Sequence, residues 1–131
     1  MRIPRPHPIL VLALLGLIAA SGAAAAADRA CFTWTSTGSG TVSVNASSST
    51  ATSPDYIYWY VWNWGDGTGG GPSGSPTTSH TYASPPPYDS TITLTVTYLP
   101  SGNYVQATCD TWPWVFPIGP QPPSSGTCCS S

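Results

Sequence analysis

From residue 28 onward, the apolar side chains follow the two-residue period of β-strands, and no segment of about ten residues shows helical spacing. Short alternating stretches are separated by Gly, Pro, Ser, Asn and Asp. Because successive side chains of a strand point to opposite sides, such stretches bury one face and expose the other. Several short strands separated by turn residues are typical of a β-sandwich or barrel. We therefore predict an all-β domain, an antiparallel sandwich.

The predicted strands are the segments 31–35, 41–45, 56–64, 79–83, 91–98 and 104–116, the last interrupted at Pro113. One face of the aromatic segment 56–64 is assigned to the core, and it carries Tyr58, Tyr60, Trp62 and Trp64. The segment 68–76 is rich in glycine and proline and has no large apolar residue. We interpret it as a flexible loop.

The first residues have the order of a secretory signal peptide. Arg2 and Arg5 precede an apolar run, and small residues follow it up to Ala27. The apolar run, residues 9–20, is too short for a comfortable transmembrane helix. We predict a signal peptide over residues 1–27, a secreted, extracellular protein, and no membrane insertion after cleavage. A sandwich domain is expected over residues 28–117, followed by a flexible Pro/Ser/Gly/Cys tail over residues 118–131.

The charged residues exclude several classes of function. After the predicted cleavage site, Arg29 is the one basic side chain against five aspartates, and the chain has no Lys or Glu. One cation cannot neutralise a row of phosphates, so we expect no nucleic-acid partner. His80 is the one histidine in this region, and no nucleophile and base can be paired with it. We therefore expect no enzyme and no cofactor. We also expect no metal site, because no Asp-x-Asp-x-Asp array is present.

Four cysteines follow the predicted cleavage site: Cys31, Cys109, Cys128 and Cys129. An even number in a small exported domain indicates disulfides. First and last strands of a sandwich often lie side by side, so we prefer the pair Cys31–Cys109, worth roughly 4 kcal/mol in the chain-entropy model. Cys128 and Cys129 then have three alternatives: a bond to each other, a disulfide-linked oligomer, or free thiols.

Three separate pieces of the chain resemble the PKD (polycystic kidney disease) domain. They are Tyr60-Val61-Trp62-Asn63-Trp64-Gly65-Asp66-Gly67-Thr68, then His80-Thr81-Tyr82-Ala83, then the alternating stretch 91–97. The resemblance implies an immunoglobulin-like β-sandwich, used outside the cell for binding or spacing rather than catalysis. It also implies a structural motif, whose members are Trp62, Trp64, Gly65, Asp66, Gly67, His80 and Tyr82.

The other aromatic side chains are the candidates for ligand binding. Flat rings stack on sugar rings and serve equally as anchors in protein contacts, and neither use needs charge. The candidate binding residues are Trp59, Trp112 and Trp114, with Tyr56 as a flank. We expect a non-catalytic binding module for a polysaccharide or an extracellular protein. Two alternatives stay open: a structural or assembly component of the cell surface cross-linked through the tail cysteines, and packing of these rings within the fold.

Overall fold

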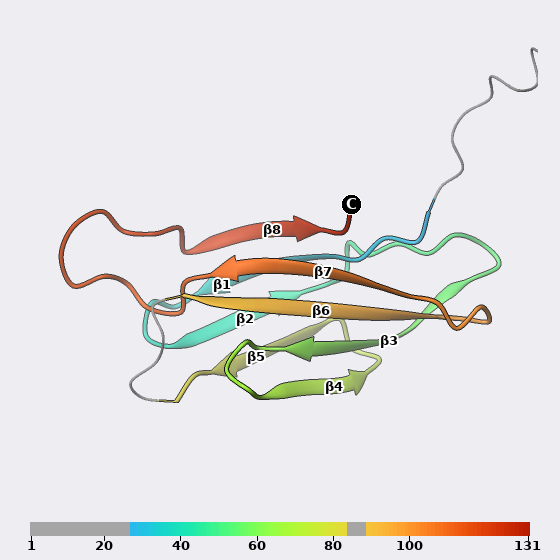
Figure 1. The fold of residues 1–131 in the computed structure, drawn as a ribbon, viewed down its shortest axis with the longest axis horizontal. Coiled ribbons are helices and arrows are strands. Elements are labelled where there is room, and N and C mark those ends of the chain that lie inside the picture. Colours follow the sequence, from blue (N-terminus) through green and yellow to red (C-terminus); the bar gives the residue numbers. More distant parts are fainter. Residues whose placement is uncertain (1–26, 84–88) are drawn as a thin grey trace, which may run out of the picture.

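The computed structural model describes residues 27–83 and 89–131, and the regular elements within them are all β-strands (Figure 1). The predicted signal peptide, apart from Ala27, lies outside the described residues. The eight strands are β1 (Cys31–Ser36), β2 (Thr41–Asn45), β3 (Tyr56–Asn63), β4 (Gly69–Ser73), β5 (Thr77–Thr81), β6 (Ser90–Leu99), β7 (Tyr104–Thr111) and β8 (Ser125–Cys129).

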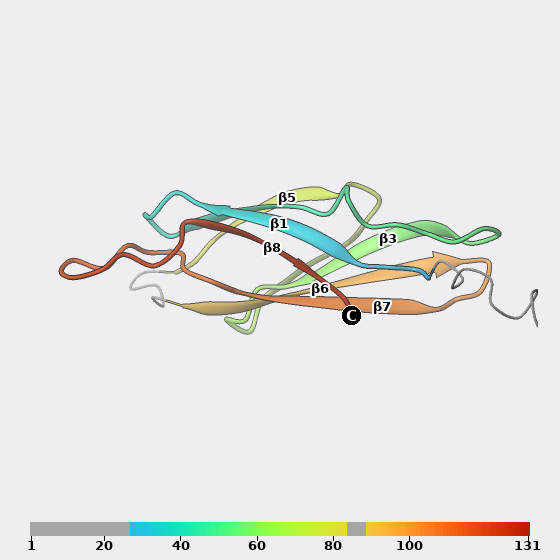
Figure 2. The ribbon, with the colours of Figure 1, turned by 90° about the horizontal axis from the view of Figure 1, so that it is seen from above.

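The strands form two antiparallel sheets that lie one above the other (Figure 2). The first sheet has the order β5-β2-β1-β8, and the second has the order β4-β3-β6-β7. Each sheet combines strands that are far apart in the chain, so the fold depends on long-range pairing. The prediction of an all-β antiparallel sandwich is confirmed.

The apolar side chains of the alternating pattern that predicted the strands also fill the space between the sheets. In β6, Ile92, Leu94 and Val96 are fully buried, while the threonines between them are not. From the first sheet, the ring of Phe32 packs edge-on against Trp62, with the ring centroids 5.1 Å apart. Each fully buried aliphatic side chain of this kind contributes about 1.5–3 kcal/mol of transfer free energy.

A β-bulge shifts the phase of β3. The register against β6 changes between Ile57 and Trp59, and Tyr58 has no register partner. For all residues on one side of such an insertion, each side chain points to the opposite face of the sheet from the one that strict alternation predicts. Ile57 therefore packs against the core, and Tyr58 is 45% exposed. The prediction that Tyr58 lies in the core is wrong, because strict alternation cannot anticipate the extra residue.

The glycine-rich segment contains an edge strand rather than only a loop. β4 pairs with β3 through Trp62↔Gly70 and Tyr60↔Ser73, with a register shift between these pairs. The pairing uses backbone groups, so it leaves no side-chain period in the sequence. The prediction of a flexible loop is wrong for residues 69–73.

The segment predicted to be a flexible tail contributes β8, the edge strand of the first sheet. It pairs with β1 along its whole length, from Cys31↔Cys129 to Thr35↔Ser125. The prediction is therefore wrong for residues 125–129, and the sandwich extends beyond residue 117.

Both disulfides hold β8. Cys129 bonds to Cys31 within the first sheet, and Cys128 bonds to Cys109 of β7 in the second sheet. The predicted pair Cys31–Cys109 is wrong, because β8 and not β7 lies beside β1. Neighbouring side chains of a strand point to opposite sides. Cys128 accordingly packs toward the core and reaches β7, while Cys129 stays with its partner on β1.

These bonds also bear on the expected oligomer. Among the described residues no cysteine is free. A cross-link to another chain through Cys128 or Cys129 would therefore require one of the two intramolecular bonds to open.

Candidate functional site

The four predicted binding residues lie at two ends of the sandwich. Tyr56, at the start of β3, pairs with Leu99 at the end of β6. Thr111, directly before Trp112, pairs with Ser90 at the start of β6. The ten residues of β6 separate these two ends by roughly 30 Å. The structure therefore does not bring the four side chains together on one surface.

Trp112 and Trp114 pack into the fold. Trp112 is half-buried, and its ring lies 6.1 Å from that of Trp34, centroid to centroid. Trp114 covers Gly40, where an added Cβ would approach the indole nitrogen to 2.8 Å. The Nε1 of Trp114 is buried without a hydrogen-bond partner among the described residues. We assign both side chains to packing.

Trp59 and Tyr56 lie on the outer face of the second sheet, together with Tyr104. Trp59 on β3 and Tyr104 on β7 both pair with Thr97 on β6. We call these three side chains, Trp59, Thr97 and Tyr104, the aromatic row. Two strand spacings put its two rings on backbones roughly 10 Å apart. Tyr104 is 67% exposed, whereas Trp59 and Thr97 are half-buried, so the row is partly open to a ligand.

The bulge in β3 fixes the position of Trp59. The extra residue, Tyr58, places its ring beside that of Trp59, with the centroids 4.5 Å apart and the planes tilted by 38°. Bulges commonly redirect side chains at functional sites. A tryptophan held by a neighbouring ring loses less conformational freedom when it binds.

A groove of about 590 Å³ lies on the same face as the aromatic row. Its lining includes Asn63, Thr93, Thr95 and Gln106, and the turn between β3 and β4 closes one side with residues 67–69. None of these described lining residues is charged. The groove therefore offers hydroxyl and amide groups, which can bind a polar, uncharged ligand by hydrogen bonds.

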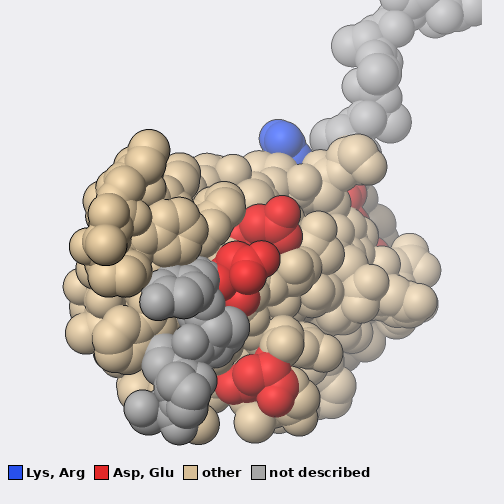
Figure 3. Space-filling model, turned by 60° about the vertical axis from the view of Figure 1, so that its left-hand side comes forward, with Lys and Arg blue, Asp and Glu red and all other residues tan. Residues whose placement is uncertain are grey.

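Three of the five aspartates lie at one end of the molecule, where Figure 3 shows a group of acidic side chains, while Asp28 and Asp55 lie near Ser101 at the opposite end. Asp66 follows β3, Asp89 precedes β6 and Asp110 lies near the end of β7, and the antiparallel register puts these positions at the same end of the second sheet. Arg29 is the one Lys or Arg among the described residues. The resulting negative potential disfavours an anionic polymer as a ligand.

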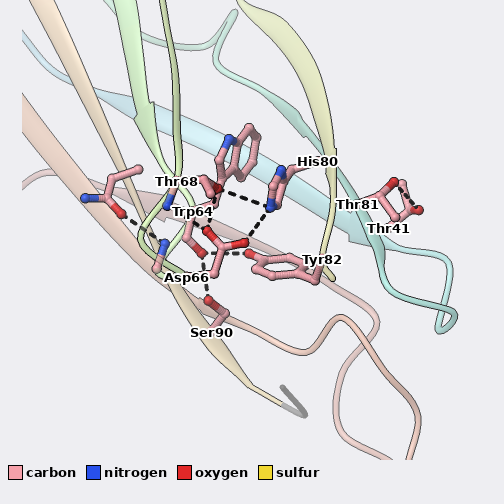
Figure 4. A network of polar contacts seen from close by, with 10 residues as sticks. Thr41, Trp64, Asp66, Thr68, His80, Thr81, Tyr82 and Ser90 are labelled. Carbon is pink, nitrogen blue, oxygen red and sulfur yellow. Dashed lines mark hydrogen bonds and ion pairs between the residues drawn. The ribbon is translucent and has the colours of Figure 1, made fainter. Parts of the chain in front are cut away.

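Residues of the segments 60–68 and 80–83 converge on the turn after β3 (Figure 4). The Asp66 carboxylate accepts hydrogen bonds from the backbone N–H of Thr68 at 3.0 Å and from its hydroxyl at 2.5 Å. Its other oxygen lies 2.7 Å from Nε2 of His80. The His80 ring in turn stacks on Trp64, with the centroids 4.9 Å apart.

This network joins the two sheets. His80 belongs to β5 of the first sheet, whereas Asp66 and Thr68 lie in the turn that follows β3 of the second. The Tyr82 hydroxyl adds a hydrogen bond to the Trp64 carbonyl at 2.8 Å. The Asp66 carboxylate and the His80 imidazole thus hydrogen-bond to each other. Together with Tyr82, they link the two sheets at one edge of the sandwich.

The Asp66 carboxylate makes stability depend on pH. Partial burial raises the pKa of Asp66, but the hydrogen bonds from Thr68 and His80 outweigh burial and lower the pKa from 3.8 to about 2. A folded-state pKa below the unfolded value stabilises the fold above about pH 4, and this contribution is lost as pH falls toward 2. We expect the stability advantage of the wild type over Asp66→Asn to shrink by about 1 kcal/mol over this range, after allowing for solvent screening.

Urea unfolding of both proteins at several pH values between 2 and 6 measures this change. Asp110→Asn is the matched control, since Asp110 accepts a hydrogen bond from the Thr91 hydroxyl at the surface. A constant difference between wild type and Asp66→Asn from pH 4 to pH 2 would show that the carboxylate contributes nothing that depends on its charge.

Sequence reasoning missed Tyr104 and Gln106. Each becomes part of the site only through pairing across strands, Tyr104 with Thr97 and Gln106 with Thr95. The segment 99–103 carries a hairpin signal, with Pro100 and Gly102 between two alternating stretches. Counting outward from that turn could have placed Tyr104 beside Thr97 on the outer face.

Comparisons with known proteins identify no relative: no family model, no curated protein and no solved structure matches the chain. Within the described ranges, no helix is long and apolar enough to cross a membrane. The same residues contain no group of three or more His, Cys, Asp or Glu that could hold a metal ion.

Proposed function

We propose that this chain is a non-catalytic binding module that contacts a neutral polysaccharide through the outer face of its second sheet. The observation that carries the proposal is the aromatic row of Trp59, Thr97 and Tyr104 beside an uncharged groove. Aromatic faces bind the apolar C–H faces of sugar rings by burying area, without needing charge. Hydroxyl and amide groups next to them can bond to sugar hydroxyls.

The composition of the face favours a polysaccharide over a protein partner. Protein interfaces concentrate apolar and aromatic side chains in a core that excludes water. Here the aromatic row is followed by threonine, asparagine and glutamine side chains that line an open groove. Such a surface stays hydrated and suits a ligand that is itself covered with hydroxyl groups.

The proposed location follows from the cysteines. Two intramolecular disulfides indicate an oxidising environment. We propose that residues 1–27 direct export and that the module acts outside the cell. The motif around Asp66 and His80 resembles that of PKD domains. This resemblance supports binding rather than catalysis.

A pull-down of the exported protein with insoluble polysaccharides, at low and high salt, tests the proposal. We expect retention on a neutral polymer that salt does not change, because charged contacts are few. Trp59→Ala and Tyr104→Ala should each weaken binding about fivefold to tenfold, from the loss of about 1 kcal/mol of ring contact. Thr33→Ala, on the exposed face of the first sheet, is the control and should bind as wild type.

Circular dichroism and thermal unfolding of each variant establish that its fold is intact. Retention on no neutral polymer, or undiminished binding by folded Trp59→Ala and Tyr104→Ala, would overturn the proposal.

A further inference from the structure

The register of the second sheet arranges its outer side chains in parallel rows. Beside the aromatic row, Val61, Thr95 and Gln106 pair across β3, β6 and β7. We call these three the amide row. Successive rows are two residues apart along each strand, which is roughly 7 Å. A molecule lying on the aromatic row therefore has the amide row along one side.

Gln106 is held in place within the amide row. Its side-chain N–H donates a hydrogen bond to the Thr95 hydroxyl oxygen at 2.9 Å. A primary amide has a second N–H donor and an oxygen that accepts, and the threonine hydroxyl keeps its own hydrogen. Both residues line the groove, so these donors and acceptors are presented to its contents. A sugar hydroxyl, which donates and accepts at once, matches them.

The two rings also define a direction. Trp59 and Tyr104 stand on strands separated by β6, with the smaller Thr97 between them. Along β6 itself, the outward residues are threonines and Leu99, so β6 carries no outward ring between the two. A chain that stacks on both rings must therefore cross the strands. The backbones that carry the two rings are roughly 10 Å apart, about the length of two sugar units in an extended chain.

We infer that a linear, neutral glycan crosses the strands on the aromatic row and that Gln106, positioned by Thr95, hydrogen-bonds to its hydroxyl groups. This inference rests on the proposed function. An extended chain whose sugars have equatorial substituents presents flat apolar faces that can cover both rings together. A curved chain with axial linkages cannot lie flat on both. Gln106 is thus a specificity residue of the groove.

Calorimetric titration of the exported protein with cello-, chito- and malto-oligosaccharides of two to six units tests the inference. We expect an extended β-linked series to bind, the affinity to rise until both rings are covered, and the malto series to bind at least tenfold more weakly. Gln106→Leu should weaken β-linked binding about tenfold, the effect of one lost hydrogen bond with an unpaired hydroxyl left behind. Thr108→Ala, an exposed position on the same strand and outside the groove lining, should change nothing.

The variants distinguish a failure of this inference from a failure of the proposed function. Loss of binding in Trp59→Ala with full binding in Gln106→Leu would overturn the role of Gln106 and leave the polysaccharide module standing. Equal affinity for the malto series would overturn the extended-chain geometry. Binding of neither an oligosaccharide nor an insoluble polymer would overturn both. Gln106→Asn, which keeps the amide on a shorter side chain, should also weaken binding, and thermal unfolding of each variant identifies any loss of fold.

Discussion

The variant Cys31→Ser/Cys129→Ser is expected to lose roughly 4 to 5 kcal/mol of unfolding free energy. The missing bond joins residues 98 positions apart, so its removal frees a long closed loop in the unfolded chain. In the chain-entropy model the stabilisation grows with the logarithm of loop length. Denaturant unfolding of the oxidised proteins measures the loss. The expected loss is of the same order as the total unfolding free energy of a domain of this size.

The second disulfide supplies the control. Cys109 and Cys128 are 19 residues apart, so Cys109→Ala/Cys128→Ala should cost less through loop closure, about 3 kcal/mol. Wild type and the Cys31→Ser/Cys129→Ser variant should become nearly equal in stability once both are fully reduced. A difference of several kcal/mol that persists after reduction would mean that side-chain packing, and not the cross-link, accounts for the loss.

Gly65→Ala is expected to cost at least 3 kcal/mol. Gly65 has a φ of +83°, and an added Cβ would lie 2.5 Å from the Thr91 carbonyl oxygen and 2.6 Å from the Ser90 hydroxyl. Left-handed backbone strain alone costs an ordinary residue about 1–2 kcal/mol. The contact with a backbone oxygen adds to it, because β6 is held between β3 and β7 and cannot move away freely.

Gly67→Ala separates strain from contact. Gly67 lies in the same turn with a φ of +88°, but its added Cβ would meet nothing within 4 Å. It should lose about 1–2 kcal/mol, the strain alone. Chemical unfolding of both variants gives the comparison, and equal losses would show that the turn relaxes away from β6.

The sequence predicts this fold where side chains carry the pattern. β6 alternates buried aliphatic residues with threonine. The sequence therefore predicts that this segment is a strand, which of its side chains point inward, and that they belong to the core. β4 and β8 are built from Gly, Ser, Pro, Thr and Cys, and they join the sheets through backbone groups that any sequence has. The disulfide prediction failed for the same reason: without β8, the nearest apparent partner of Cys31 is Cys109.

The candidate site was predicted in part. Trp59 and Tyr56 were identified because a strand with aromatics on both faces must expose some of them. Trp112 and Trp114 look similar in sequence, but they pack against Trp34 of β1 and Gly40, which directly precedes β2. The groove and the place of Tyr104 depend on register across three strands. Pairing of that kind is a tertiary property, and local pattern does not determine it.

The two bonds of β8 also order events during synthesis. A chain emerges from the ribosome with its N-terminal residues first. Both cross-links need residues 128 and 129, which follow the other seven strands in the chain. Until they arrive in an oxidising compartment, Cys31 and Cys109 are two thiols without their proper partners. A chain that stops before residue 128 therefore retains only those two cysteines, and the bond open to it is the one between them.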